Sequence, residues 1–352
     1  MRHSSACWRP ILAGVCAARP RGVRALSQVP STSFIAGGPV FRAAGLAPPA
    51  GNELRRWRSL GELLLTEGGL GESEAAIRRV YHLALPVYFY LRGLHDRPRR
   101  TPAPAPAHER APPLMVGLQC MQGGGKTTLC EQLCALLAHE GLSAVQLSID
   151  DFYLTHAELC RLERDRPDQP LLHGRGNPGT HDMQLMTSTL GALRGLSAGE
   201  AAAVPRYDKS AHSGAGDRAP RDTWPAVIGP VDLVLLEGWC LGFEPGPPPP
   251  PAGYEAVEGH LDEFAPVHAA LDAFVVVKAR EMHYVYEWRE EAEAERRARG
   301  DGAMTQAEVR AFVDRYMPSY RRCLSRLYER GPLPADRTLR FTIDRSRSPV
   351  EG

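Results

Sequence analysis

The chain has 352 residues, which is enough for two average domains or for one larger α/β domain with appendages. Apolar residues make up 43% of it, so a substantial core can form, and no apolar run reaches the roughly 18 residues that a membrane-spanning helix needs. The formal net charge is +1, which gives no indication of nucleic acid or an anionic membrane as a partner. The eight cysteines form no C-x-x-C pair, so buried thiols are expected rather than a disulfide framework or a zinc site.

The first 52 residues differ in composition from the rest of the chain. They contain no acidic residue, several serines and alanines, and the arginines Arg2, Arg9, Arg19, Arg21, Arg24 and Arg42. This composition is typical of an organellar transit peptide, so we expect residues 1–52 to be disordered and to lie outside the fold. A secretory signal is the weaker alternative, because the apolar stretch Ile11–Ala18 is short and interrupted.

Two segments precede the main domain. Apolar side chains recur at helical spacing over residues 53–98, which predicts an N-terminal helical segment of two helices. Residues 99–113 are rich in Pro, Ala and Arg, a composition typical of a mobile linker.

The main domain is expected over residues 114–346, where short apolar runs alternate with helical segments. The runs predict strands at Leu114–Leu118, Ala144–Ile149, Val231–Leu236, Ala273–Val277 and Thr338–Ile343. This alternation predicts an α/β fold of the P-loop NTPase type, in three layers, with a mostly parallel sheet flanked by helices and with the N-terminal helical extension added. Ligands bind such sheets at the carboxyl ends of the strands. The proline tract within residues 244–252 is expected to be a surface insertion; a ligand for a partner domain is the alternative.

A glycine-rich turn joins the first predicted strand to an amphipathic segment. Glycines let backbone N–H groups approach phosphate oxygens, Lys126 would reach the β- and γ-phosphates, and Thr127 would hold Mg²⁺. Cys120 stands where the usual pattern has its first glycine, and a chance sequence in a flexible loop is the alternative interpretation. The strand before it and the helix after it favour a nucleotide-binding loop made of Gln122, Gly123, Gly124, Gly125, Lys126, Thr127 and Thr128.

Acidic residues follow the second and third predicted strands. The second strand leads into Asp150 and Asp151, and phosphoryl transfer to a hydroxyl requires a carboxylate that orients the nucleophile and takes its proton. We expect Asp150 to be this base and also to contact Mg²⁺, with Asp151 in support or capping the turn that follows. The third strand ends at Glu237, the arrangement in which a carboxylate reaches Mg²⁺ beside a phosphate loop.

Six motifs in this order resemble the D-glycerate 3-kinase family of plants and fungi, whose fold is related to uridine kinase, pantothenate kinase and phosphoribulokinase. They are Gln122–Thr128, Ile149–Thr155, Gly176–Asp182, Pro205–Ser210, Gly216–Arg218 and Leu236–Trp239. The resemblance covers about residues 75–352 and includes Tyr286–Arg289 and Phe312–Pro318. It implies a kinase that uses ATP and Mg²⁺ and converts D-glycerate to 3-phosphoglycerate. It also implies that Arg289 lies on a lid that closes over ATP.

Polar loops supply the expected substrate contacts. Glycerate is a small anion, so its pocket needs cations and hydroxyl partners, and Arg206 and Lys209 are the first candidates for gripping its carboxylate and the migrating phosphoryl group, before Arg218. For any one of these cations a solvated loop is the alternative. The other candidate substrate contacts are Tyr153, Asn177, Thr180, His181, Asp182 and Tyr207; His181 as a second base, and Asp182 as a helix cap, are open alternatives.

Two rival functions remain open from the sequence. The first is a P-loop kinase of another acceptor, namely a nucleoside, pantothenate or a sugar phosphate. The second is a regulatory ATPase, which the aspartates of the 150–151 loop disfavour because a switch needs no hydroxyl-activating base. The resemblance and the leader together predict a chloroplast enzyme of photorespiratory glycerate salvage, with the mitochondrion as the alternative. We expect a small-molecule substrate, and a monomer or weak homo-oligomer.

Overall fold

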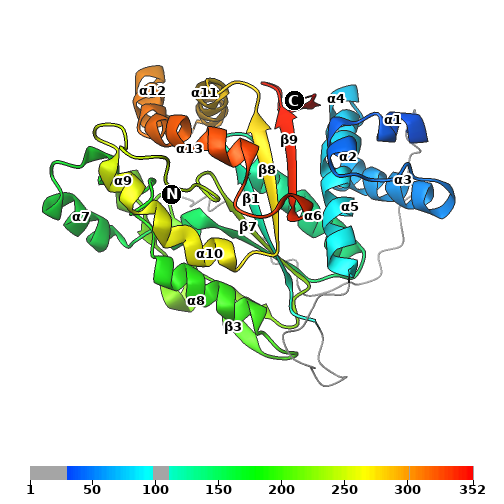
Figure 1. Ribbon diagram of the computed structural model, residues 1–352, viewed down its shortest axis with the longest axis horizontal. Helices are drawn as coiled ribbons and strands as arrows, with labels where there is room; N and C mark the ends of the chain where they lie inside the picture. The colour runs from blue at the N-terminus through cyan, green and yellow to red at the C-terminus, as the bar shows by residue number, and fades with distance from the viewer. Residues whose placement is uncertain (1–29, 98–110, 301, 352) are drawn as a thin grey trace.

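The computed structural model describes residues 30–97, 111–300 and 302–351. A six-stranded sheet lies at its centre, in the order β10-β9-β8-β1-β7-β2 (Figure 1). The strands are β1 Leu114–Cys120, β2 Ala144–Ser148, β7 Leu233–Gly238, β8 Ala273–Ala279, β9 Thr338–Ile343 and β10 Pro349–Val350. All neighbours pair in parallel except β10, which pairs antiparallel with β9. The five predicted strands and the mostly parallel sheet are confirmed, and β10 is an addition beyond the predicted domain end at 346.

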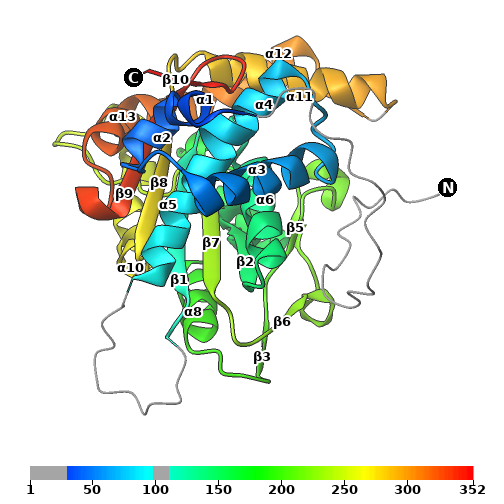
Figure 2. The same cartoon turned by 90° about the vertical axis from the view of Figure 1, so that its right-hand side faces the viewer.

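Helices cover both faces of the sheet and complete three layers. On one side lie α8 Met183–Arg194, α10 Ala265–Ala269 and α13 Met317–Glu329, and on the other lies α6 Lys126–His139 (Figures 1 and 2). β1 and β7 are buried along their whole length, as expected for strands covered on both faces. The P-loop NTPase-type fold is therefore confirmed.

The N-terminal helices lie on the same side of the sheet as α6, partly beside it and partly outside it. They are α1 Thr32–Ala36, α2 Pro39–Ala43, α3 Gly51–Thr66, α4 Glu74–Arg79 and α5 Leu85–Asp96 (Figure 2). A π-helical turn, Val80–Ala84, joins α4 to α5. α3 packs against α6, and α2 packs against β9 and β10. Two predicted helices over residues 53–98 therefore correspond to α3 and to the α4–α5 unit.

The expectation that residues 1–52 are disordered is wrong for residues 30–52. Residues 30–52 belong to the fold: Ile35 and Val40 are 0% exposed and Phe41 is 3% exposed, and Phe41 lies against Trp57 of α3 with ring centroids 5.7 Å apart. The two helices α1 and α2 are short, so no apolar periodicity marks them in the sequence. Residues 1–29 lie outside the described residues, and so does the predicted linker except for residues 111–113.

The remaining helices and strand pairs lie outside the central sheet. They are α7 His156–Asp165, α9 Glu255–Gly259, α11 Tyr284–Ala298, α12 Gln306–Asp314 and the two-stranded pairs β3 Ala201–Ala203 with β6 Ala226–Ile228 and β4 Tyr207–Asp208 with β5 Asp217–Arg218. The β3–β6 pair lies at the end away from α11 and α12 (Figures 1 and 2). The proline tract forms no helix or strand, and α13 holds it: Arg322 donates to Pro247 O at 2.5 Å, and Arg326 pairs with Glu244 at 2.8 Å.

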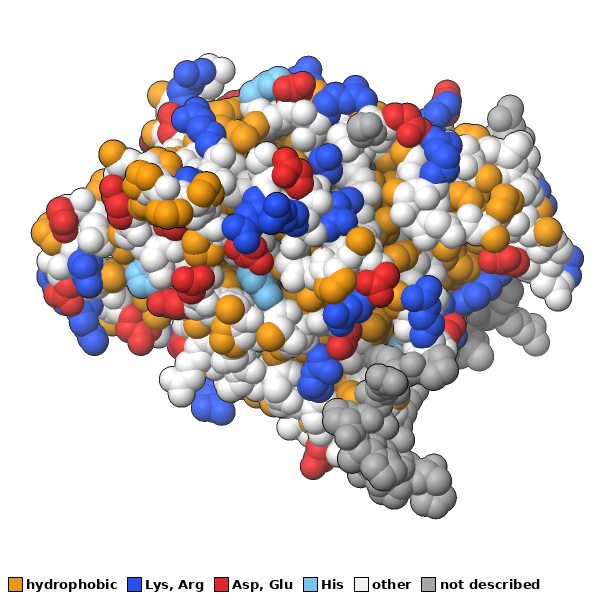
Figure 3. Space-filling model, viewed as in Figure 1, with side chains coloured by type: hydrophobic (Ala, Val, Ile, Leu, Met, Phe, Trp, Pro, Cys, Tyr) orange, Lys and Arg blue, Asp and Glu red, His pale blue; other side chains and the backbone are white. Residues whose placement is uncertain are grey.

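Basic and acidic side chains are intermixed on the face seen in Figure 3, with a group of Lys and Arg near its middle. This fits the small net charge of the chain. Within the described residues, every helix is too short or too polar to cross a bilayer.

Candidate active site

The sheet register brings the predicted phosphate loop and the acidic residues to one edge. Glu237 at the end of β7 stands opposite Leu118 on β1 and opposite Ser148 on β2. The loop after β1 therefore begins beside Glu237, and Asp150 follows two residues after Ser148 on the other side. The charges of Lys126 and Asp150 both affect the pKa of Glu237, which agrees with the three side chains lying near one another.

The geometry of the P-loop explains its glycines. Gly123 and Gly125 have φ values of 79° and 92°, which disfavour residues with a side chain. At Gly123 a Cβ would lie 2.6 Å from the Cβ of Trp288 on α11, and at Gly124 it would lie 2.2 Å from Cys120 Sγ. Cys120 itself is 0% exposed, so the residue that replaces the usual first glycine is a packed thiol. At Gly123 and Gly124 the loop backbone therefore lies too close to Trp288 and Cys120 to accommodate a side chain.

Lys126 and Thr127 begin α6 and face the other site residues. Lys126 Nζ donates to Met121 O at 3.4 Å, and Thr127 Oγ1 donates to Glu237 Oε1 at 3.0 Å. Burial raises the pKa of Glu237, against the attraction of the Lys126 ammonium. A hydroxyl and a carboxylate that face each other supply hard oxygen ligands, the type that Mg²⁺ prefers. Thr127 and Glu237 therefore fit the predicted metal site.

Asp150 makes two charge-assisted contacts. Lys209 Nζ lies 2.6 Å from Oδ2, and the Tyr153 hydroxyl donates to Oδ1 at 2.9 Å. Burial alone would raise the pKa of Asp150, but Lys209 and then Tyr153 lower it to about 2. The Lys209 side chain is 58% exposed, whereas the Asp150 side chain is only 25% exposed.

Asp151 is turned toward the backbone and a different cation. Its Oδ2 accepts from Ser148 N at 3.3 Å, which completes a capping box in the turn Ile149–Phe152. Arg206 Nη1 lies 3.4 Å from the same oxygen. Burial raises the pKa of Asp151, and Arg206 opposes this. Lys209 and Arg206, which the sequence predicts as cations for the substrate, are instead paired here with Asp150 and Asp151, one base to each acid.

Two buried polar groups beside Asp150 lack hydrogen-bond partners among the described residues. They are the ring nitrogens of His181, which is 5% exposed, and the hydroxyl of Tyr207. Both rings lie against Tyr153, with centroids 4.6 Å and 5.3 Å away. Burial lowers the pKa of His181 to about 4, although Asp150 attracts its proton. A neutral imidazole and a free hydroxyl are available there for a polar ligand.

Asn177 and Thr180 do not match their expected role as substrate ligands. Both are 0% exposed: Asn177 Nδ2 donates to Leu171 O and Arg315 O, and Thr180 Oγ1 donates to Asn177 O at 2.7 Å. Their polar groups are used to fold the 176–182 loop. We therefore leave them out of the proposed substrate contacts.

Asp182 and Arg218 also act within the fold. The Asp182 side chain accepts from Leu185 N as the N-cap of α8, which is the alternative allowed by the sequence. Arg218 donates to Asp182 at 3.0 Å and to Tyr153 O at 2.9 Å, so it ties its loop to α8. Its Nε is buried and lacks a partner in the described part of the chain.

Arg289 is turned away from the phosphate loop toward its own helix and α12. It pairs with Glu293 at 2.5 Å and lies 4.7 Å from the ring centroid of Phe312. The residue before it, Trp288, is the one that packs on the loop. A lid role for Arg289 would require α11 or its side chain to move and stays a prediction.

Sequence patterns did not reveal Tyr320 of α13 as a contact of the phosphate loop. Its hydroxyl accepts from Gln122 N at 3.1 Å and donates to Gln122 Oε1 at 3.2 Å. Gln122 is thereby fixed by a residue 198 positions away. No local signal predicts such a contact.

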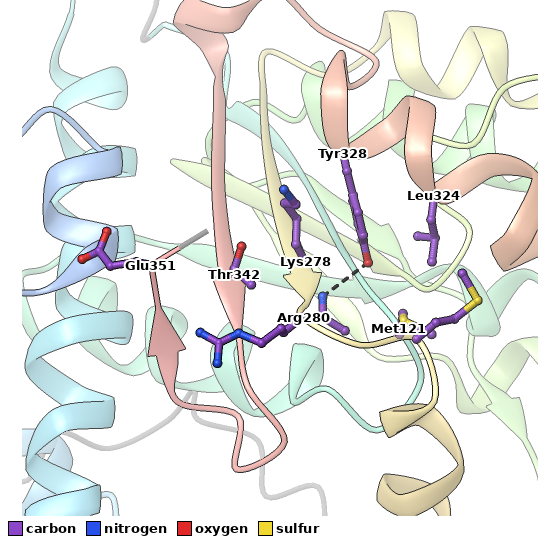
Figure 4. Close-up of a pocket in the computed structure, with 9 residues that line it drawn as sticks. Met121, Lys278, Arg280, Leu324, Tyr328, Thr342 and Glu351 are labelled. Atoms are coloured by element: carbon purple, nitrogen blue, oxygen red, sulfur yellow. Dashed lines mark hydrogen bonds between the residues drawn. The ribbon is translucent and has the colours of Figure 1, made fainter.

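A cleft of about 330 Å³ opens beside the phosphate loop at the carboxyl ends of β8 and β9 (Figure 4). Met121 and Leu324 lie on one side of it and Thr342 and Glu351 on the other, with Lys278 and Tyr328 between them. The Tyr328 hydroxyl accepts from Ala279 N at 3.3 Å. Because it adjoins the loop that would hold the phosphates, the cleft is candidate space for the nucleoside end of a nucleotide.

A glycine-rich loop lies between β1 and α6 and ends in a lysine and a threonine. With Glu237 in β7 and Asp150 just after β2, it defines a P-loop kinase. A D-glycerate 3-kinase of Arabidopsis thaliana, named as chloroplastic, is 37% identical over 332 residues, which are 90% of this chain and 72% of that protein. The kinase mug58 of Schizosaccharomyces pombe is 35% identical over 68% of this chain and 90% of its own length. The chain therefore belongs to the D-glycerate 3-kinase family.

Comparison of structures agrees with this assignment. A D-glycerate 3-kinase from Cryptococcus neoformans superposes with a TM-score of 0.66 and 30% identity, covering 76% of this chain and 97% of that one. No family model matches the chain.

Proposed function

We propose that this kinase transfers the γ-phosphate of ATP to the 3-hydroxyl of D-glycerate and releases 3-phosphoglycerate and ADP. The observation that carries the proposal is the convergence of Lys126, Glu237 and Asp150 at one edge of the sheet. Phosphoryl transfer needs a cation beside the migrating group and an anion beside the nucleophile, and these residues supply both. Family membership, with relatives named as D-glycerate 3-kinases, supports the choice of acceptor.

In this proposal the phosphate loop and α6 bind the triphosphate. Backbone N–H groups at Gly123–Gly125 and the Lys126 ammonium contact its oxygens, and Thr127 and Glu237 hold Mg²⁺. Bound Mg²⁺ would neutralise charge on the β- and γ-phosphates. Within the described residues, three or more His, Cys, Asp or Glu side chains nowhere gather as a preformed metal cage. A site with few protein ligands is what a nucleotide-bound Mg²⁺ requires.

Asp150 orients the attacking hydroxyl and accepts its proton. A carboxylate with a pKa of about 2 is a weak base, so the pairing with Lys209 has to change when the substrate is bound. The exposed Lys209 moves to the carboxylate of glycerate or to the migrating phosphoryl group. Asp150 is then left with Tyr153 in a buried position, and burial raises its pKa and its basicity. Arg206 supports this step by holding Asp151 and the turn.

Neutral partners complete the acceptor site. His181 and Tyr207 supply hydrogen bonds to the hydroxyl groups of glycerate, because both have unused polar atoms beside Tyr153. A second general base at His181 is less favoured, since burial lowers its pKa to about 4. At that pKa the imidazole has little driving force to take a proton from an alcohol.

A panel of acceptors tests the assignment. ADP release from MgATP is measured with D-glycerate, uridine, pantothenate and a pentose phosphate in turn. We expect kcat/KM for D-glycerate to exceed the others by at least about a hundredfold, because a pocket of cations and hydrogen-bond donors rejects acceptors that leave those groups unpaired. If another acceptor of the panel were preferred, the assignment of D-glycerate would be wrong, but the assignment of the chain as a kinase would stand. Hydrolysis that no acceptor stimulates would instead support the regulatory ATPase.

We further propose that the chain is imported into an organelle by a leader within residues 1–29. The arginine-rich composition without acids supports a leader, and the burial of Ile35, Val40 and Phe41 supports an end before residue 30. The Arabidopsis relative named as chloroplastic favours the chloroplast over the mitochondrion. A role in photorespiratory glycerate salvage is part of this proposal and rests on the family resemblance alone. Fusion of residues 1–29 to a fluorescent reporter tests this proposal, and a cytosolic reporter would contradict it.

A further inference from the structure

The turn between β9 and β10, residues 344–348, has a closely defined backbone. Asp344 N donates to Ser348 O and Arg347 N donates to Asp344 O, both at 2.9 Å. The Asp344 carboxylate accepts from Ser346 Oγ at 2.7 Å and from Ser348 N at 3.0 Å. These bonds hold Arg347 at a φ of 64°, a left-handed conformation that is strained for a residue other than glycine. The turn therefore fixes where the Arg347 side chain begins.

The Arg347 side chain reaches the phosphate loop from this turn. Its Nε donates to Gly123 O at 2.7 Å. Its Cδ lies 4.0 Å from the position that a Cβ would occupy at Gly125. Gly123 and Gly125 are the two left-handed residues of the loop, so Arg347 contacts it where its backbone turns.

The same guanidinium contacts α11. Nη1 pairs with Glu291 at 2.8 Å, and Cζ lies 5.3 Å from the ring centroid of Trp288. Trp288 Nε1 donates to Arg345 O at 2.7 Å, and its Cβ lies against Gly123. The turn, the loop and the first turns of α11 are thus packed as one unit, with Arg347 in contact with all three.

The N-terminal layer holds this unit from the outside. Arg79 of α4 donates to Ser346 O at 3.1 Å, and Arg42 of α2 pairs with Glu351 after β10. Both contacts come from helices outside the P-loop fold. They give the N-terminal layer a physical link to the phosphate loop through the turn.

We propose that Arg347 is a positioning residue of the nucleotide site, which fixes the phosphate-loop backbone at Gly123 relative to α11. This inference rests on the proposed use of ATP but not on the identity of the acceptor. Glycine would adopt the left-handed conformation without strain, and an arginine there supplies contacts that glycine lacks. Because the loop N–H groups must converge on phosphate oxygens, a displaced Gly123 weakens nucleotide binding more than it slows the transfer step.

Arg347→Gly tests the proposal without straining the turn. We expect the Kd for MgADP, measured by calorimetry, and the KM for ATP to rise about tenfold, the effect of losing one charge-assisted hydrogen bond. The kcat and the KM for D-glycerate should stay within about twofold of wild type, and the thermal midpoint should not fall by more than a few degrees. Arg347→Lys should give an intermediate Kd, because one ammonium cannot serve Gly123 O and Glu291 with the geometry of a guanidinium.

Arg345→Ala is the matched control. Arg345 belongs to the same turn and pairs with Glu287 of the same helix, but within the described residues no hydrogen bond or ion pair joins its side chain to the phosphate loop. We expect its Kd for MgADP to stay within about twofold of wild type.

Calorimetry with MgADP separates this proposal from the choice of acceptor. Suppose that the chain phosphorylates some other acceptor and that Arg347→Gly still raises the Kd for MgADP tenfold. This result would support the role of Arg347 and overturn only the assignment of D-glycerate as acceptor. An unchanged Kd in a folded Arg347→Gly variant would overturn the inference, and so would an equal rise in the Arg345→Ala control. A wild-type chain that binds no MgADP would overturn both proposals.

Discussion

At the scale of single residues, the adjacent acids Asp150 and Asp151 have different partners. Asp150 faces Lys209 and the Tyr153 hydroxyl, whereas Asp151 accepts from a backbone N–H and from Arg206. The first set includes Lys209, whose side chain is 58% exposed. The second set closes a turn. We therefore infer that Asp150 takes part in the reaction and that Asp151 holds the turn that positions it.

Asp150→Asn and Asp151→Asn are expected to separate these roles. Asp150→Asn removes the proton acceptor and should lower kcat at least about a hundredfold with little change in the KM for ATP. Asp151→Asn should lower kcat less than tenfold and reduce the free energy of unfolding by about 1 kcal/mol, since it weakens a capping box. Steady-state kinetics and urea unfolding of both variants measure this difference. A larger loss of kcat in Asp151→Asn would reverse the assignment.

Two buried histidines predict an acid-labile fold. Burial lowers the pKa of His181 and of His268 to about 4, and His268 Nε2 accepts from Gly242 N at 2.9 Å. In the unfolded chain these groups take up protons below pH about 6.5, whereas in the folded chain they stay neutral down to pH about 4. The unfolded state then binds more protons, so stability falls as the pH falls from about 6.5 to about 4.

Urea unfolding at several pH values measures this loss. We expect each histidine to contribute on the order of 2–3 kcal/mol by pH 4. His268→Gln keeps an acceptor for Gly242 N and does not titrate, so its stability should depend less on pH than that of the wild type. Equal pH dependence in the two proteins would show that His268 is not one of the groups responsible.

At the scale of elements, the contact between α3 and the π-helical turn depends on a glycine. A Cβ at Gly61 of α3 would lie 2.2 Å from the hydroxyl oxygen of Tyr81, which is 0% exposed. At Gly93 of α5, which is exposed, nothing in the described structure lies within 4 Å of such a Cβ. The same substitution should therefore have opposite effects at the two sites.

Gly61→Ala should lower the free energy of unfolding by about 1–3 kcal/mol, because an overpacked core has to shift. Gly93→Ala should raise it by about 0.5–1 kcal/mol, because alanine favours an exposed helix interior. Chemical unfolding of the two variants in parallel checks both signs. Destabilisation by Gly93→Ala, or none by Gly61→Ala, would contradict the described packing.

The sequence allowed the strands to be predicted well because each is a short apolar run. For β1 and β7 this is how a strand buried on both faces appears. The P-loop, Asp150 and Glu237 could be placed because they follow those strands directly. Helices α1 and α2 could not be predicted, because a helix of five residues is too short to show an apolar periodicity. Asn177, Tyr320 and Arg347 show a second limit: their contacts are made across the fold, and no local pattern tells a buried structural amide from a ligand.

At the scale of the whole molecule, the N-terminal layer is part of the enzyme. Removal of residues 1–29 should leave the thermal midpoint and activity unchanged, whereas removal of residues 1–52 takes away Ile35, Val40 and Phe41 from the core. Each buried side chain of this kind contributes about 1.5–3 kcal/mol, so the shorter chain should lose several kcal/mol or fail to fold. Thermal unfolding of both truncated proteins measures this. Equal stability of the two would contradict the described packing of α1 and α2.

The central claim is that the phosphate loop, Glu237 and Asp150 act together on one triphosphate and one acceptor hydroxyl. Its most direct test is to measure ADP and 3-phosphoglycerate together when the protein is given MgATP, with and without D-glycerate. We predict that the two products form in equal amounts and that ADP release without D-glycerate is at least about a hundredfold slower. ADP release at the same rate without D-glycerate, or no 3-phosphoglycerate with it, would contradict the account.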